Sequence, residues 1–257
     1  MEVILIFFVA HWYLSLFFQT FFLHRYASHK SFTMSKGWEK VFFVLTWFFQ
    51  GSNYLSPYGY GIMHRMHHAY ADTPNDPHSP KYDESIWKMM WKTKTIYSDI
   101  TSKKVTVDSR FTKDVPEWPA FDKFARSWFS RLIWAGVYIT VYAVFATHWW
   151  LWLLLPIQFL LSPIHGAIIN WFAHKYGYTN YKVGDTSKNF LPFDFLMMGE
   201  SYHNNHHKHG NRANFGGVRW HEIDPTYIAI KIFDKVGIVK IVKPKEIELS
   251  EANKVAA

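Results

Sequence analysis

Cysteine is absent from this sequence of 257 residues. Disulfide bonds, c-type haem attachment and iron–sulfur clusters are therefore excluded, because each of them needs thiol side chains. The side chains with metal chemistry that remain in quantity are the imidazoles of 15 histidines.

Positive charge is missing from two long stretches. Neither lysine nor arginine occurs in residues 1–24 or 132–174, so all 28 of them lie in residues 25–131 and 175–257. The positive-inside rule predicts that the stretches carrying lysine and arginine lie in the cytoplasm. We therefore expect a protein of a bacterial inner membrane, with these stretches on the cytoplasmic side. A net charge of +8 can indicate nucleic-acid binding, but this placement favours a membrane, and no nucleic-acid partner is expected.

The two stretches without lysine or arginine hold long apolar runs. Three segments approach the ~20 apolar residues needed to cross a bilayer, at about 3–23, 131–147 and 150–173. The first is longer than a usual signal-peptide core and has no cleavage site, so we expect a retained span. Residues 41–50 are apolar but too short to cross, and they predict an interfacial helix that enters the bilayer and returns.

The rest of the chain is more polar. Residues 81–131 are rich in lysine, tryptophan and tyrosine, which favours a surface on an anionic bilayer. Residues 226–236 predict a short amphipathic helix. We expect one domain over residues 1–243 and a polar tail over 244–257. The expected fold class is all-α. We expect an integral membrane protein with about three transmembrane helices, an interfacial helix and a cytoplasmic helical cap.

Two histidine triplets share the spacing H-x-x-H-H. On a helix the three imidazoles of such a triplet lie at i, i+3 and i+4, on one face, where they can grip a metal. The triplets are His64, His67 and His68, and His203, His206 and His207.

Two further pairs complete the set of candidate metal ligands. His24 and His29 are five residues apart, which does not stack on an ideal α-helix, so we expect a helix end or distortion there. Asn170 and His174 are spaced i, i+4. A zinc-type site takes about four ligands, far fewer than these nine imidazoles. The simplest interpretation is that two metal ions share them.

The remaining six histidines are interpreted as ordinary surface or hydrogen-bonded residues: His11, His78, His148, His165, His209 and His221. Asp72 and Asp76 could orient ligand histidines or simply cap turns. Glu200 precedes His203 as Glu-x-x-His, and because that motif occurs here once we expect Glu200 beside the ligands and not among them. His165 could lie near the site or be structural.

Imidazole alone does not identify the metal, since it suits zinc, copper, iron and nickel. A dinuclear histidine site at a membrane surface, above apolar spans, favours oxygen activation on a lipid chain. A membrane haem held by His11 and His165 is a different alternative, but it would leave nine clustered histidines unexplained.

The histidine motifs, in their order and spacing, resemble those of membrane fatty acyl desaturases of the stearoyl-CoA desaturase type. The resemblance rests on H-x4-H, H-x2-H-H, N-x3-H and G-E-x2-H-N-x-H-H, and it extends to Asp72-Thr73, Asp76-Pro77-His78 and Asp224-Pro225-Thr226. The resemblance covers most of the chain and implies a short form of such a desaturase, like those of bacteria.

The resemblance implies a Δ9-type cis desaturation that uses O2, two electrons and two non-haem iron ions. One iron would take His24, His29, His64, His68 and His206. The other would take His67, His174, His203 and His207, with Asn170 acting through a water. A di-iron lipid hydroxylase or other monooxygenase is the alternative that shares this chemistry.

Three departures from the family pattern bear on substrate and partners. One span precedes the first histidine pair, where the family usually has a hairpin. Ile62 and Met63 stand where animal enzymes have an Arg-Asp pair for coenzyme A, so acyl-CoA and acyl-lipid both remain open as carriers. No cytochrome b5 domain is fused, so a separate ferredoxin or cytochrome b5 system is expected to supply electrons.

Overall fold

The computed structural model describes residues 1–242, and the expected polar tail at 244–257 lies outside this range. The described part is mostly helical. Its elements are α1 (Glu2–Phe18), η1 (Gln19–Ser28), β1 (Phe32–Met34), α2 (Lys36–Gln50), η2 (Gly51–Asn53), α3 (Pro57–Tyr70), α4 (Ile86–Thr101), α5 (Ser109–Thr112), α6 (Pro119–Ala125), α7 (Trp128–Phe145), η3 (Trp149–Leu153), α8 (Leu154–Gln158), α9 (Leu161–Ala167), η4 (Ile168–Phe172), α10 (His203–Lys208), α11 (Pro225–Lys235) and β2 (Val239–Ile241).

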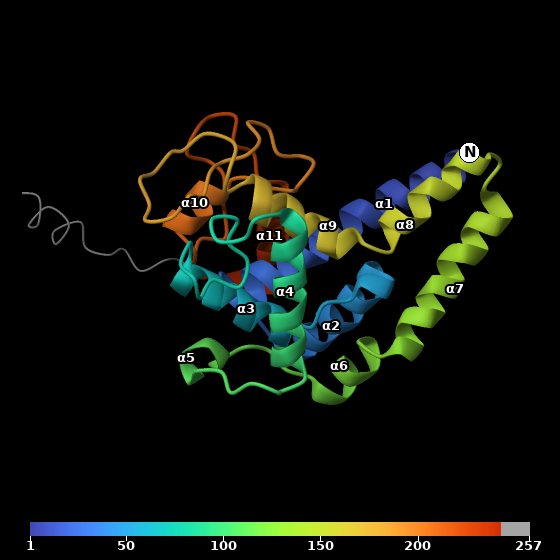
Figure 1. Cartoon of the computed structure of the whole chain (residues 1–257), viewed down its shortest axis with the longest axis horizontal. Helices are drawn as coiled ribbons and strands as arrows, with labels where there is room; N and C mark the ends of the chain where they lie inside the picture. Colours follow the sequence, from blue (N-terminus) through green and yellow to red (C-terminus); the bar gives the residue numbers. More distant parts are fainter. Residues whose placement is uncertain (243–257) are drawn as a thin grey trace, which may run out of the picture.

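Apolar helices form an arm that extends from a compact cap (Figure 1). The continuous helix Glu2–Ser28 and α7 are long and apolar enough to cross a membrane. Helices α1, α7 and α8 run into this arm, and the N-terminus lies beside the turn that follows α7. The cap holds α3, α4, α10 and α11, at the opposite end of α1.

The third expected span is not a single straight helix. Trp149–Gln158 and Leu161–Phe172 meet at a bend of 68°, and together they could form a third crossing. Pro163 lies just after the bend, and because proline has no backbone N–H it cannot donate to the carbonyl of Phe159. The span expected at 150–173 is therefore made of two apolar halves that meet at an angle.

Helix α2 runs back beside α1 and ends before it reaches the end of the arm (Figure 1). Ser35 caps its first turn by accepting a hydrogen bond from the N–H of Trp38. The two helices share an aromatic core in which the rings of Phe18 on α1 and Phe49 on α2 are 5.0 Å apart. The exposed face of α2 is apolar too, with Phe48 52% exposed, which suits contact with lipid.

Two short strands interrupt the all-helical pattern. β1 and β2 pair antiparallel, with Phe32 opposite Ile241, and join the segment after η1 to the segment after α11. The expected all-α class is therefore incomplete. Three-residue strands carry too little alternation to be recognised in sequence.

Candidate metal centre

A π-helix positions the first histidine pair. Residues Gln19–Ser28 form a π-helix, in which each backbone N–H bonds to the carbonyl five residues earlier. His29 follows directly. The rings of His24 and His29 consequently lie close together, with centroids 5.1 Å apart. The distortion expected from the i, i+5 spacing is present.

Three other segments bring the remaining histidines to the same place. Helix α3 starts with a Ser56 cap and Pro57 in its first turn, and it carries the triplet 64–68 along one face. Helix α10 carries the triplet 203–207. A second short π-helix, η4, carries Asn170 and leads into His174.

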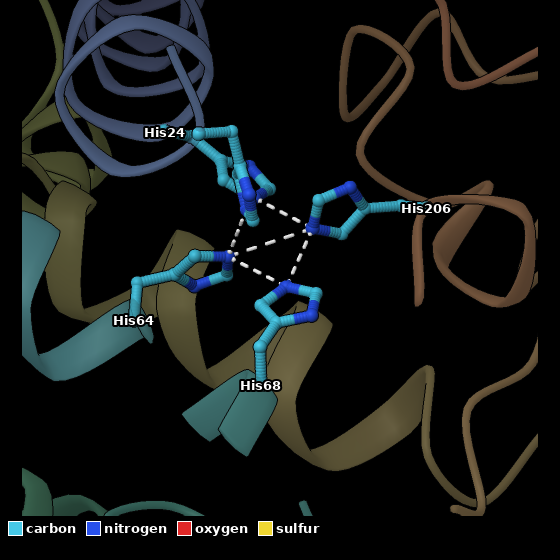
Figure 2. A group of neighbouring side chains, drawn as sticks. His24, His64, His68 and His206 are labelled. Atoms are coloured by element: carbon cyan, nitrogen blue, oxygen red, sulfur yellow. Dashed lines mark hydrogen bonds between the residues drawn. The ribbon is translucent and has the colours of Figure 1, made fainter. Parts of the chain in front are cut away.

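Five histidines form a first group, drawn in part in Figure 2: His24, His29, His64, His68 and His206. One nitrogen from each lies within 4.8 Å of the others. Neighbouring Nε2 atoms are closer still, at 2.8 Å between His29 and His64 and between His68 and His206. The Nε2 atoms of His24 and His206 are 3.0 Å apart.

Four histidines form a second group: His67, His174, His203 and His207. Their ligand nitrogens also lie within 4.8 Å of one another. The Nε2 atoms of His174 and His203 are 3.0 Å apart, and those of His67 and His207 are 3.3 Å apart. The two groups have the same membership as the two ligand sets that the resemblance implies.

Carboxylates lie behind several of the rings. Nδ1 of His24 is 2.5 Å from Glu200, and Nδ1 of His207 is 2.8 Å from Asp185. Nδ1 of His67 is 2.9 Å from an oxygen of Asp76. A carboxylate accepts, so each of these Nδ1 atoms carries a proton and donates it. In a neutral ring this leaves Nε2 as a lone pair directed at its neighbours.

This tautomer assignment distinguishes a metal site from a hydrogen-bonded cluster. If Nδ1 holds the proton in both His67 and His207, neither Nε2 has a hydrogen to donate across the 3.3 Å between them. Two facing lone pairs repel each other unless a cation lies between or beside them. The residues present therefore fit a bound metal ion.

Burial keeps the imidazoles in the form that binds metal. Removal from water lowers the pKa of His64 and of His206 well below the usual histidine value, and the neighbouring histidines lower it further. The same causes lower the pKa of His203 and His207. Neutral imidazole is the ligand form, so protons do not compete at neutral pH.

The other expected site residues lie around the two groups. Asp72 accepts from the N–H of Thr186 and from the Ser79 hydroxyl, and its carboxylate is 3.9 Å from Nδ1 of His174. His165 is buried in the helix bundle with its ring 4.5 Å from that of Trp12.

A small cavity lies between the histidines and the apolar arm. Its volume is about 50 Å³, room for a few waters or a short stretch of acyl chain. Its lining includes Leu16, Tyr60, His165, Asn170, Met197 and His203. Asn170 thus faces the same space as the second histidine group.

Three residues beside the histidine groups were not expected there from the sequence: His78, Asp185 and Thr186. His78, expected to be ordinary, is buried with its ring 4.3 Å from that of His67, and neither ring nitrogen has a hydrogen-bond partner in the described part of the chain. Asp185 and Thr186 pair with Nδ1 of His207 and His174. They lie on an irregular loop, where no spacing signal marks them, whereas His78 stood in the motif Asp76-Pro77-His78.

The fold and the site together define a helical protein with two or three apolar membrane-type helices beneath two buried histidine groups that could hold metal ions. The chain belongs to the fatty acid desaturase family, whose model matches residues 2–236.

Individual relatives agree with this assignment. The chain is 31% identical over 225 residues to the sn-1 stearoyl-lipid 9-desaturase of Synechocystis sp., an alignment that covers 86% of the chain and 65% of that relative. It is 30% identical to the sn-1 stearoyl-lipid 9-desaturase of Anabaena variabilis, over 86% of the chain and 76% of the relative. It is 30% identical to the Delta-9 desaturase-like 5 protein of Arabidopsis thaliana, over 89% and 73%.

Proposed function

We propose that the protein is an O2-dependent fatty acyl desaturase that introduces a cis double bond, at Δ9, into a saturated acyl chain carried on a membrane lipid. The balanced reaction removes two hydrogens from adjacent CH2 groups, and with O2, two electrons and two protons it yields the alkene and two waters. This activity belongs to unsaturated fatty acid biosynthesis. Its main support is the pair of histidine groups beside a small cavity, in a chain of the desaturase family.

The two groups would hold two non-haem iron ions, one in each. The first would use His24, His29, His64, His68 and His206, and the second His67, His174, His203 and His207, with Asn170 contributing through a water. Two bound irons would supply Lewis acidity and accept the donor's electrons, the chemistry by which O2 is activated. The chain's own residues would hold the ions, orient the ligands and exclude water.

Carboxylates around the ligands set ring orientation and tautomer. Glu200, Asp76 and Asp185 each accept the Nδ1 proton of one histidine, which turns Nε2 inward and raises its basicity. Glu200 is also tied to Thr20 and lies near Arg25, so its position is fixed from both sides. These residues hold the site and need not touch substrate.

The cavity wall keeps water out and holds the acyl chain. Leu16, Ile169 and Met197 pack together on the side of the cavity that faces the apolar arm. A saturated chain has no polar group to be recognised, so shape alone must hold two adjacent carbons near the histidines. Small displacements there would change the outcome strongly.

The carrier is proposed to be a lipid and not coenzyme A. Ile62 is fully buried and Met63 is 7% exposed, so the positions of the animal Arg-Asp pair offer no charge to a nucleotide phosphate. The named relatives from Synechocystis sp. and Anabaena variabilis are stearoyl-lipid desaturases. The membrane is proposed to be a bacterial inner membrane with the histidine groups on its cytoplasmic side.

Lipid analysis of cells that express the protein tests this function. A Δ9 cis-monoene should accumulate in intact glycerolipids, and the variant His64→Ala should accumulate none. Hydroxy-acyl lipids as the main new product would instead assign the protein to the hydroxylase alternative. Unsaturation confined to the acyl-CoA pool would contradict the proposed carrier.

A further inference from the structure

The histidine groups are approached from two separate sides. The small cavity touches His24, His64 and His203. A wider hollow of about 390 Å³ lies elsewhere on the cap and is floored by His29 and His68, both partly exposed. The two hollows share no lining residue. The histidines are therefore reached from the apolar arm through the small cavity and, separately, from the cap surface through the wider hollow.

Positive charge surrounds the wider hollow. Lys30, Arg65 and Arg110 line it. All four hydrogen bonds of the Arg65 guanidinium go to backbone carbonyls, of Ala27, Ser28, Phe111 and Lys113, and within the described residues it forms no ion pair. Its charge is therefore held in place by uncharged backbone partners.

The end of α10 and the loop after it add further cations beside the hollow. Lys208, the last residue of α10, and Arg212 are exposed on either side of Asn211, which lines the hollow. A Cβ placed on the neighbouring Gly210 would lie 3.5 Å from the ring of His29. Opposing charge is sparse: Asp108 is paired with Arg110 at 3.3 Å, and Asp114 is exposed nearby. The rim is thus strongly positive directly above two histidines.

We propose that this basic hollow, defined by Lys30, Arg65, Arg110, Lys208 and Arg212, is the docking surface for a small acidic electron-transfer protein. The proposal rests on the proposed function, which needs two electrons per double bond. Two molecules of a reduced one-electron carrier would dock in turn and leave oxidised, and the protons would come from solvent. Charge complementarity speeds such encounters, and redox complexes typically bury under about 1,200 Å².

A nucleotide phosphate fits the hollow less well. The hollow is not continuous with the cavity beneath the histidines, so a carrier held by its phosphate here would not deliver an acyl chain there. Instead, the partly exposed rings of His29 and His68 give an electron donor its shortest approach to the site. Both features favour a redox protein.

Charge reversal tests the docking surface. The full chain is reconstituted in nanodiscs, and the probe is a plant-type [2Fe–2S] ferredoxin, a small acidic protein. Arg110→Glu combined with Arg212→Glu should weaken ferredoxin binding at least tenfold at low salt, and the difference should shrink at high salt. The control is Lys123→Glu, a single charge reversal on exposed α6 away from the hollow, which should bind as the unaltered protein does.

A second pair guards against misfolding. Lys208→Glu combined with Arg212→Glu alters side chains that make no hydrogen bond within residues 1–242, and it should weaken binding similarly. For each variant, desaturation is measured with ferredoxin and, separately, with dithionite and methyl viologen. The ratio of the first rate to the second should fall at least tenfold in both pairs and remain constant in the control.

Three results would overturn the proposal: unchanged ferredoxin binding in both pairs, equal loss in Lys123→Glu, or weakened binding of coenzyme A in place of ferredoxin. Failure of the proposed function looks different. In that case the unaltered protein would show no desaturation, either with ferredoxin or with dithionite and methyl viologen. The ferredoxin binding measurements would still test the docking surface.

Discussion

Three histidines of the two groups, His24, His67 and His207, have a different task for each ring nitrogen. Where Nδ1 is engaged by Glu200, Asp76 or Asp185, the proton is fixed on the outer nitrogen and the inner nitrogen is free to bind metal. The outer partners lie on a loop after α3 and on loops flanking η4 and α10. Residues far apart in sequence therefore share control of one centre.

Loss of an inner ligand should be severe. Replacing His64 or His207 with alanine removes a nitrogen from the middle of a group, and we expect desaturation to fall below detection with loss of about one iron per chain. Metal analysis and product analysis check this. His148→Ala, at an exposed turn, should leave both quantities unchanged. Equal tolerance at all three positions would contradict the ligand assignment.

Loss of an outer partner should be milder. Glu200→Gln keeps the size of the side chain but weakens the acceptor for Nδ1 of His24. We expect activity to fall ~10–100-fold, with iron affinity reduced in a similar range. The measurement is kcat alongside iron retention during dialysis against a chelator. A loss as complete as in His64→Ala would instead make Glu200 a direct ligand.

At the residue scale the sequence indicates the nine clustered histidines, with Asp76 and Glu200 beside them, but it does not indicate Asp185. Clustering and H-x-x-H-H spacing are local signals, whereas the pairing of Asp185 with His207 depends on how an irregular loop folds. His78 stands in the motif Asp76-Pro77-His78, but no second histidine lies three or four residues from it to mark it as part of a ligand cluster. Its burial beside His67 is a tertiary effect.

Elements are held in place by a few close approaches of the backbone. Gly51 ends α2 with φ at +56°, and a Cβ there would lie 1.8 Å from the Tyr138 hydroxyl of α7. Only glycine fits this junction between the interfacial helix and the second span. The same tyrosine hydroxyl lies 3.2 Å from Nε2 of His11 on α1, so three helices meet at one point.

A pair of glycine variants tests this junction. Gly51→Ala should destabilise the protein by about 1–3 kcal/mol, because it adds both overpacking and a strained left-handed backbone. Gly136→Ala lies on α7 with nothing within 4 Å of the new methyl group, so it should be neutral or slightly stabilising. Thermal unfolding in the same detergent compares them. Equal melting temperatures would show that Gly51 is not required by packing.

At the element scale, periodicity predicts the apolar helices but not their irregularities. The i, i+5 pair His24 and His29 indicated a distortion, and a π-helix is present. Pro156 and Pro163 indicated a weakened third span, but the sequence did not predict the 68° angle of the bend or the pairing of β1 with β2. A proline in an apolar run is compatible with a kink or a break, and the surrounding helices decide which occurs.

The whole molecule separates an arm without lysine or arginine from a basic cap. No lysine or arginine occurs in residues 1–24 or 132–174, and these segments form the arm in Figure 1. Charge placement and histidine placement agree, so the sequence predicts one topology. We expect the N-terminus and the turn after α7 on the outer side, and the histidine groups on the cytoplasmic side.

The absence of cysteine makes this topology directly testable. Single variants Thr147→Cys and Lys182→Cys can be labelled in intact cells with an impermeant maleimide, without background from native thiols. Thr147→Cys should react from outside, and Lys182→Cys only after the membrane is permeabilised. Labelling of both from the same side would mean that the bent pair Trp149–Phe172 does not cross.

The central claim is that oxygen activated at the histidine centre leaves as water and is not inserted into the acyl chain. The direct test supplies purified protein in nanodiscs with a stearoyl lipid, labelled O2 and a reductant, and measures where the label goes. The account predicts a cis-monounsaturated lipid without label, and label recovered in water. A labelled hydroxy-acyl lipid as the main product would contradict it.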